Sequence, residues 1–179
     1  MPVCRKYGPA VHNFPMTQKR SARTDLTPAG RMEEAGLQHV LGYQLAQASL
    51  VTDAIFFDQV GKPFNLRPVE CTVLVLIAEN PGGSLVRLAR ALSVTPPNIS
   101  TMVDRLEGKG LVARESSEKD RRAHVLHVTP KGAELARKAI DRIVAGETAA
   151  LSLTPGEQAI LAELLHKVAA ARGKAGTAG

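Results

Sequence analysis

The side chains best suited to chemistry in this chain are polar groups that recur along one side of the segment from Thr95 to Gly110. If the segment is a helix, that side carries Pro97, Asn98, Ser100, Thr101, Asp104 and Arg105. Short amide and hydroxyl groups, with Thr95 just before the helix among them, can approach the edges of nucleic-acid bases, and the Arg105 guanidinium can reach a phosphate. Taken alone, however, the segment is better explained as an ordinary amphipathic helix with a solvated outer face.

The same segment has clear helix signals. Thr95 can serve as N-cap, and Pro96 and Pro97 fall in the first turn, where a missing N–H costs little. Gly108 and Gly110 can end the helix because they tolerate left-handed backbone. Four apolar residues share the side opposite the polar groups: Ile99, Met102, Val103 and Leu106. We therefore predict a helix with one core face.

The flanking sequence predicts the elements that would position this helix. Upstream, Ser84 can cap a short helix, and only Ser93 and Val94 separate the two helices, as in a helix-turn-helix. Its apolar stripe is Leu85, Leu88, Ala89 and Leu92. Downstream, residues 111–114 and 123–128 predict two short strands joined by a charged tip. Residues 84–131 hold nine Lys or Arg and five Asp or Glu, so most of the formal charge of +6 falls here.

At the hairpin the sequence resembles a known family. The segments VDRLEGKGLVAR and DRRAHVLHVTPKG are similar to those of the multiple-antibiotic-resistance regulator (MarR) family. The specific motifs lie within residues 95–132, and helix order and spacing extend the resemblance to 37–170. The resemblance implies that Asp120 pairs with protein cations and orients the wing, while Arg122 enters the minor groove of DNA. The resemblance assigns no specific role to Lys119, Arg121 and Arg114. They would contact the DNA backbone or form part of a solvated run of charges.

The expected fold is mainly α with a small β-wing: a winged helix-turn-helix domain with dimerisation helices at its N- and C-terminal ends. We divide the chain into a basic, mobile leader (1–36), the winged domain (37–172) and a flexible tail (173–179). Within the domain we expect the helix-turn-helix at 84–108, the wing at 111–128, and dimerisation helices at about 37–60 and 130–172. A further helix opens at Pro68. The resemblance implies a homodimer, and twofold symmetry suits two half-sites of a pseudopalindromic DNA operator.

Several function classes lack support in the sequence. The five histidines are scattered, and no nucleophile, phosphate-loop or metal-ligand motif occurs, so we expect no enzyme, no cofactor and no metal. No apolar run is long enough for a membrane span, and no secretory signal is evident, so we expect a cytoplasmic protein. Cys4 and Cys71 predict neither a structural disulfide nor a metal pair.

We interpret the chain as a sequence-specific transcriptional repressor that a small molecule releases from DNA. The resemblance implies an aromatic acid or its coenzyme A thioester as effector. The candidate polar groups for it are His39, Tyr43, Gln44, Gln47 and Arg67. The first four are equally consistent with a hydrophilic face or dimer contacts, and Arg67 would place a cation near the effector cleft or near the DNA. Arg67 stands where the family commonly has a Ser or Thr helix cap. A thiol-based redox regulator and a non-specific architectural DNA-binding protein are the alternatives.

Overall fold

The computed structural model describes residues 26–116 and 124–172, and it falls into two units, 1–45 and 46–179. In the first unit, Leu26 and Glu33 form an isolated β-bridge, and the Tyr43 hydroxyl donates to Glu34 Oε2 over 2.5 Å. Helix α1, Leu41–Phe56, begins in this unit and ends in the next. No helix in the described ranges has the length and apolarity needed to cross a membrane.

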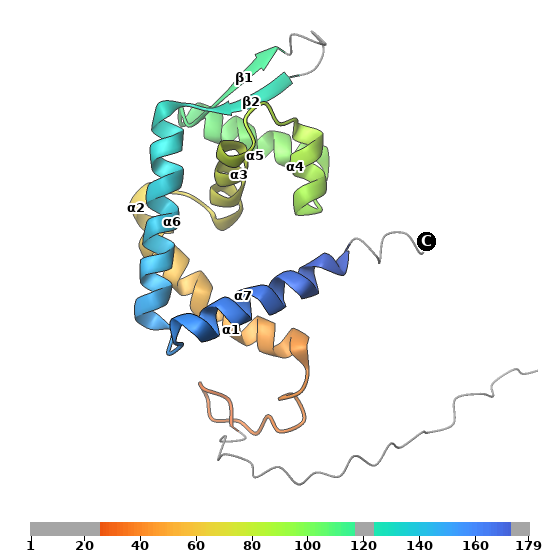
Figure 1. The fold of residues 1–179 in the computed structure, drawn as a ribbon, viewed down its shortest axis with the longest axis vertical. Helices are drawn as coiled ribbons and strands as arrows, with labels where there is room; N and C mark the ends of the chain where they lie inside the picture. Colours follow the sequence, from red (N-terminus) through yellow and green to blue (C-terminus); the bar gives the residue numbers. More distant parts are fainter. Residues whose placement is uncertain (1–25, 117–123, 173–179) are drawn as a thin grey trace, which may run out of the picture. The chain divides into compact units, whose positions relative to one another are not determined.

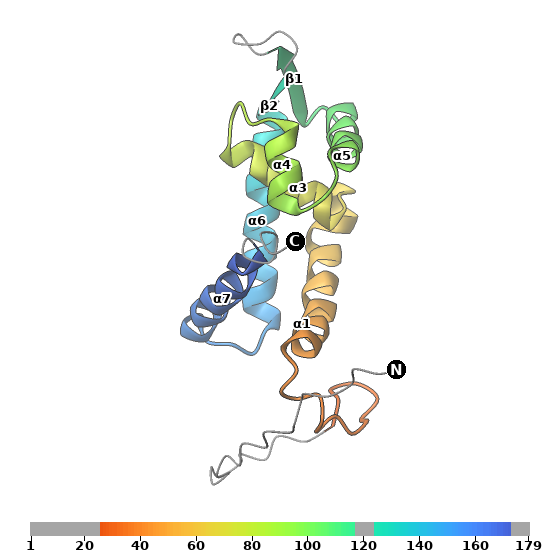
Figure 2. The same ribbon diagram turned by 90° about the vertical axis from the view of Figure 1, so that its right-hand side faces the viewer.

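The second unit is mainly helical with one antiparallel hairpin (Figure 1). Its elements in chain order are the end of α1, the π-helical turn η1 (Phe57–Gly61), α2 (Lys62–Phe64), α3 (Pro68–Glu79), α4 (Leu85–Leu92), α5 (Pro96–Gly108), β1 (Val112–Ser116), β2 (His124–Val128), α6 (Pro130–Ala150) and α7 (Pro155–Ala170). Helices α3, α4 and α5 lie together beside the hairpin, and α6 leads away from it toward α7 (Figures 1 and 2). This arrangement confirms a winged helix-turn-helix fold.

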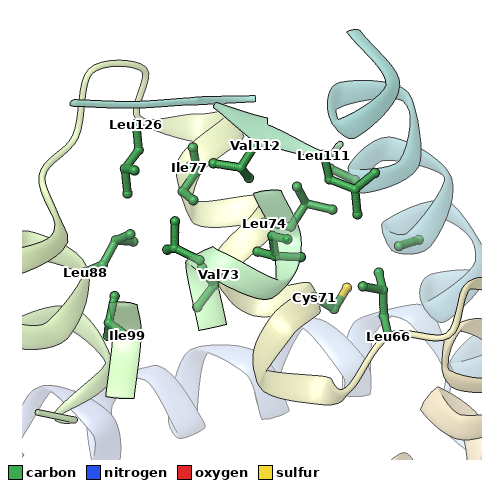
Figure 3. Packing of buried hydrophobic residues seen from close by; sticks show 14 of the residues in the cluster. Leu66, Cys71, Val73, Leu74, Ile77, Leu88, Ile99, Leu111, Val112 and Leu126 are labelled. Atoms are coloured by element: carbon green, nitrogen blue, oxygen red, sulfur yellow. The ribbon is translucent and has the colours of Figure 1, made fainter. Parts of the chain in front are cut away.

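One core holds the winged part of this unit together. The central residues come from α3, whose Val73, Leu74 and Ile77 are buried among side chains of α4, α5 and the hairpin (Figure 3). The predicted core face of α5 is confirmed, because Ile99, Val103 and Leu106 are fully buried and Met102 packs against the cluster. The fold of the candidate site thus depends on apolar periodicity that the sequence already displays.

Side chains cap the starts of three helices, and the cap at Ser84 confirms the prediction. Ser84 Oγ accepts from the Arg87 amide, and Thr129 Oγ1 accepts from the Gly132 amide. Thr154 and Glu157 form a capping box at the start of α7. At α5 the outcome differs, because Thr95 occupies the N-cap position with no capping bond from its side chain.

The first long helix needs a correction at both ends. We expected it to begin near Leu37, but residues 34–40 form turns, and α1 begins at Leu41. Gly36, in the middle of those turns, disfavours helix. The end expected at about residue 60 is also wrong, because helical turns continue to Phe64. The Lys62 amide bonds to the Phe57 carbonyl as a π-turn, Pro63 fits the first turn of α2, and the helical path ends where Asn65 is left-handed.

The hairpin is joined to the helix-turn-helix by backbone hydrogen bonds. Val112 pairs with Val128 and Arg114 with Leu126 in the two-stranded register. On the other side of β2, Leu126 exchanges backbone bonds with Gly82 and Gly83, just before α4, at 3.0 Å each. The base of the wing is therefore held on both sides.

Gly132 provides a test of how closely α6 packs under the wing. A Cβ at this position would overlap the Leu111 carbonyl oxygen, so the backbone of one of the two segments would have to shift. We expect Gly132→Ala to lower the free energy of unfolding by about 2 to 3 kcal/mol, as measured by urea denaturation. Gly156→Ala is the control, because its Cβ meets nothing within 4 Å, and it should leave stability unchanged or slightly higher. Equal effects of the two changes would contradict this packing.

Candidate nucleic-acid interface

The N-terminal half of α5 presents the predicted polar face to solvent. Thr95, Pro97, Asn98 and Thr101 are exposed, and Ser100 is half-buried. The Thr101 hydroxyl donates to the Pro97 carbonyl over 3.1 Å, and the residue is exposed. The side-chain amide of Asn98 makes no hydrogen bond to any described residue, so its donor and acceptor are both available to a base edge.

Arg105, at the other end of α5, is already engaged within the protein. Its Nη1 lies 3.5 Å from Oε1 of Glu70, a residue of α3 that is only 3% exposed. Nearly half of the Arg105 side chain remains exposed, so it can still reach a ligand. The prediction that it contacts a phosphate stays open, but the residue also joins α5 to α3.

Glu70 is the one buried charged residue in the described ranges, and three donors hold it. Its Oε2 accepts from the Arg67 amide over 3.1 Å and lies 3.4 Å from Lys109 Nζ. Desolvation by burial would raise the pKa of Glu70, but these bonds and the positive charges of Lys109 and Arg105 hold the pKa below its ordinary value. Glu70 therefore stays ionised and ties the start of α3 to the end of α5.

Arg114 corrects the sequence analysis, which gave this residue only a backbone contact or a place in a solvated charge run. Its guanidinium pairs with Asp104, lies 3.4 Å from Glu107 Oε2, and donates to the Ser100 carbonyl over 3.4 Å. The side chain is 23% exposed, and its Nε is buried without a hydrogen-bond partner among the described residues. Arg114 thus fastens β1 to α5, so the wing and the recognition face are held at one relative position.

The wing tip lies outside the described residues. Lys119, Asp120, Arg121 and Arg122 all fall in 117–123, so their predicted roles stay predictions. At the described base of the wing, His127 Nε2 lies 3.7 Å from Glu115 Oε2. The structure therefore confirms the two strands at the base of the predicted wing.

Two further cations near this surface have no role predicted from the sequence. Arg87 and Arg90 lie on α4, are exposed, and make no ion pair within the described residues. They are three positions apart on the side opposite the buried Leu88 and Ala89, a spacing that could have pointed to them. Both can add positive charge beside α5.

The five candidate effector residues are divided between the two units, so their grouping into one site stays a prediction. His39, Tyr43 and Gln44 belong to the first unit, and Gln47 and Arg67 belong to the second. Arg67 is the N-cap residue of α3, where its backbone amide, not its side chain, bonds to Glu70. No three His, Cys, Asp or Glu side chains of the described chain gather closely enough to hold a metal ion.

An apolar cavity of about 260 Å³ lies elsewhere in the second unit, and its lining includes none of those five residues. It is lined by Phe56, Pro68, Cys71, Thr72, Val75, Leu76, Ile140 and Ile143. Burial raises the pKa of the Cys71 thiol, so the thiol stays protonated and unreactive. This cavity suits a small apolar or aromatic molecule better than it suits thiol chemistry.

Comparison with known proteins decides the family. The MarR family model matches residues 66–124. The repressor Rv2887 of Mycobacterium tuberculosis is 33% identical over 107 residues, which cover 59% of this chain and 77% of that protein. The chain belongs to the MarR family. It is therefore a transcriptional regulator and not an enzyme.

Other MarR-type relatives agree in sequence and fold. A putative regulatory protein for the hcr operon of Thauera aromatica is 35% identical over 94 residues, covering 52% of this chain and only 57% of that protein. The repressor CouR, solved on a 23-mer DNA duplex, is 30% identical with a TM-score of 0.70, covering 78% of this chain and 99% of CouR. Rv2887, solved with p-aminosalicylic acid, gives 30% identity and a TM-score of 0.58 over 72% of this chain and 98% of that chain.

The Arg114 clamp generates a stability prediction for this MarR protein. Arg114→Lys keeps the charge but cannot bond to Asp104, Glu107 and the Ser100 carbonyl together, because it lacks the guanidinium fork. We expect a loss of about 1 to 2 kcal/mol in the free energy of unfolding, measured by urea denaturation. Arg137→Lys is the control, since Arg137 makes one exposed pair with Asp141 and should change stability by less than about 0.5 kcal/mol. Equal losses of unfolding free energy in the two variants would exclude a stabilising role for the contacts of Arg114.

Proposed function

We propose that this MarR protein is a homodimeric repressor that binds a pseudopalindromic DNA operator and leaves it when a small molecule binds. The observation that carries the proposal is the exposed face of α5 around Asn98, held to the wing through Arg114. A helix that recognises base edges must be held rigidly, because a small displacement of its side chains would lose the hydrogen bonds that discriminate between bases. DNA as the partner also agrees with residence in the cytoplasm.

Repression is supported by the relatives. CouR is described as a repressor and was solved on a DNA duplex, and Rv2887 is also named a repressor. Both are about 30% identical to this chain. The exposed cations Arg87 and Arg90 and the basic wing sequence supply the positive charge that phosphate contacts require.

Dimerisation is supported by apolar surface that the single chain leaves uncovered. Helix α7 buries none of its residues. Five of its large apolar side chains are exposed: Ile160, Leu161, Leu164, Leu165 and Val168. Apolar surface of this extent on a regulatory protein indicates a protein interface, and a second copy of the chain offers the matching face. A twofold dimer then presents two copies of α5 to two half-sites.

An effector is supported by the cavity beside α3. Pro68, Cys71 and Thr72 line it from the first turns of α3, whereas Glu70 in the same turns holds Arg105 of α5. A ligand that shifts this end of α3 would therefore disturb α5 as well. Rv2887, solved with p-aminosalicylic acid, suggests an aromatic acid as the first probe.

Operator binding tests the DNA-reading role. On a duplex recovered by selection from random DNA, Asn98→Ala should weaken binding by tenfold or more, because the variant cannot form a bidentate pair with a base. The same change should have little effect on unrelated DNA. Arg122→Ala should likewise weaken operator binding, because no guanidinium then enters the minor groove.

Lys138→Ala is the charge control for these variants. Lys138 lies on α6, and its one ion pair within the described residues is with Glu134 at the surface. If Asn98→Ala and Arg122→Ala bind the operator as well as Lys138→Ala does at the same salt concentration, sequence-specific reading by α5 and the wing is excluded. Binding that only follows ionic strength would then favour an architectural protein.

A cavity-filling variant tests the effector site. In Thr72→Phe the ring should occupy the cavity, because Thr72 is exposed at its edge. We expect p-aminosalicylic acid to raise the melting temperature of the wild-type protein but not of this variant, while operator binding persists. Thr148→Phe is the matched control, since Thr148 is also an exposed helical Thr bonded to a carbonyl four residues back. A ligand response that survives in Thr72→Phe would exclude this cavity.

A further inference from the structure

A second cleft, of about 270 Å³, lies where the end of α5 meets the start of α3. It is lined by Asn65, Arg67, Glu70, Arg105 and Lys109, and we call it the basic cleft. It shares no lining residue with the apolar cavity beside α3. Its chemistry is ionic, so it would take a different kind of ligand.

The basic cleft holds more positive than negative charge. Arg67, Arg105 and Lys109 supply three cations, and Glu70 supplies the single carboxylate. Both carboxylate oxygens are already in use, Oε1 with Arg105 and Oε2 with Lys109 and the Arg67 amide. The net charge of the lining is therefore about +2, although only Arg67 has no ion pair within the described residues.

The cations are fixed in place to different degrees. Lys109 Nζ donates to the Asn65 carbonyl over 2.6 Å as well as approaching Glu70, and Asn65 holds that carbonyl in left-handed backbone. Arg105 is anchored by Glu70 and remains 47% exposed. Arg67 is exposed, and its guanidinium makes no ion pair with any described residue. The cleft thus has two positioned cations and one free guanidinium.

We infer that the basic cleft binds phosphate. A guanidinium donates two parallel hydrogen bonds to phosphate oxygens, and an amine adds a point charge. The excess of two charges matches one phosphate monoester or two consecutive phosphodiesters of a DNA strand, whereas a single carboxylate would balance only half of it. Two sources offer this chemistry, the DNA backbone flanking the operator and a free phosphorylated ligand.

The DNA source rests on the proposed function, because Arg105 belongs to the helix that is proposed to read the operator. The free-ligand source does not, so the two can fail separately. Arg67→Gln is the informative variant. Its side chain takes no part in the cap of α3 or in holding Glu70, so the protein should fold normally. Arg137→Gln removes the same charge from an exposed pair on α6.

The first measurement is thermal melting of the full chain without DNA, in inorganic phosphate or pyrophosphate against chloride at matched ionic strength. If a free phosphorylated ligand is the source, phosphate raises the melting temperature of the wild-type protein and Arg137→Gln by several degrees. Arg67→Gln should lose most of this shift. This result requires no operator, so it stands even if the proposed DNA binding fails.

The second measurement is the salt dependence of operator binding in phosphate-free buffer. If the DNA backbone is the source, the slope of log affinity against log salt should be shallower by about 0.9 in Arg67→Gln for each phosphate that Arg67 neutralises in the wild-type complex. Arg137→Gln should keep the wild-type slope. The inference is overturned if Arg67→Gln and Arg137→Gln behave alike in both measurements. Wild-type protein that binds no selected DNA would count against the proposed function and leave the melting result to decide the cleft.

Discussion

Burial of α3 is the constraint on which the rest of the winged unit depends. Val73 and Leu74 are fully buried, Ile77 nearly so, and around them pack α5, the hairpin and α6 (Figure 3). Because protein interiors are close-packed, none of these elements can move far without opening a cavity or a clash. The exposed face of α5 is therefore placed by side chains that never touch a ligand.

Two ionic contacts refine that placement at the C-terminal turns of α5. Arg114 joins β1 to these turns through Asp104 and Glu107, and Glu70 joins α3 to them through Arg105. Apolar packing alone allows a helix to slide slightly along its neighbour, whereas paired charges favour a single position of the helix. The same Glu70 lies among the turns of α3 that line the apolar cavity, so a single helix contacts both that cavity and α5.

The sequence predicted the helix-turn-helix well because its signals are local. Apolar spacing, the cap at Ser84 and the short turn at Ser93 each act over a few residues. Contacts between distant segments carry no such signal, so Arg114 was given a solvated role, and the pairing of Glu70 with Arg105 was not foreseen. The end of the first helix was misplaced because Gly and Pro usually mark a helix end. Here a π-turn carries the helical path past Gly61 and Pro63 to the left-handed Asn65.

Selection of bound duplexes from random DNA by the full-length protein tests the central claim most directly, that the chain is one half of a twofold reader of DNA sequence. The account predicts a pseudopalindrome whose half-sites are centred about one helical turn, or roughly 10 to 10.5 base pairs, apart. Recovered duplexes with no common sequence, or with one unrepeated half-site, would contradict it.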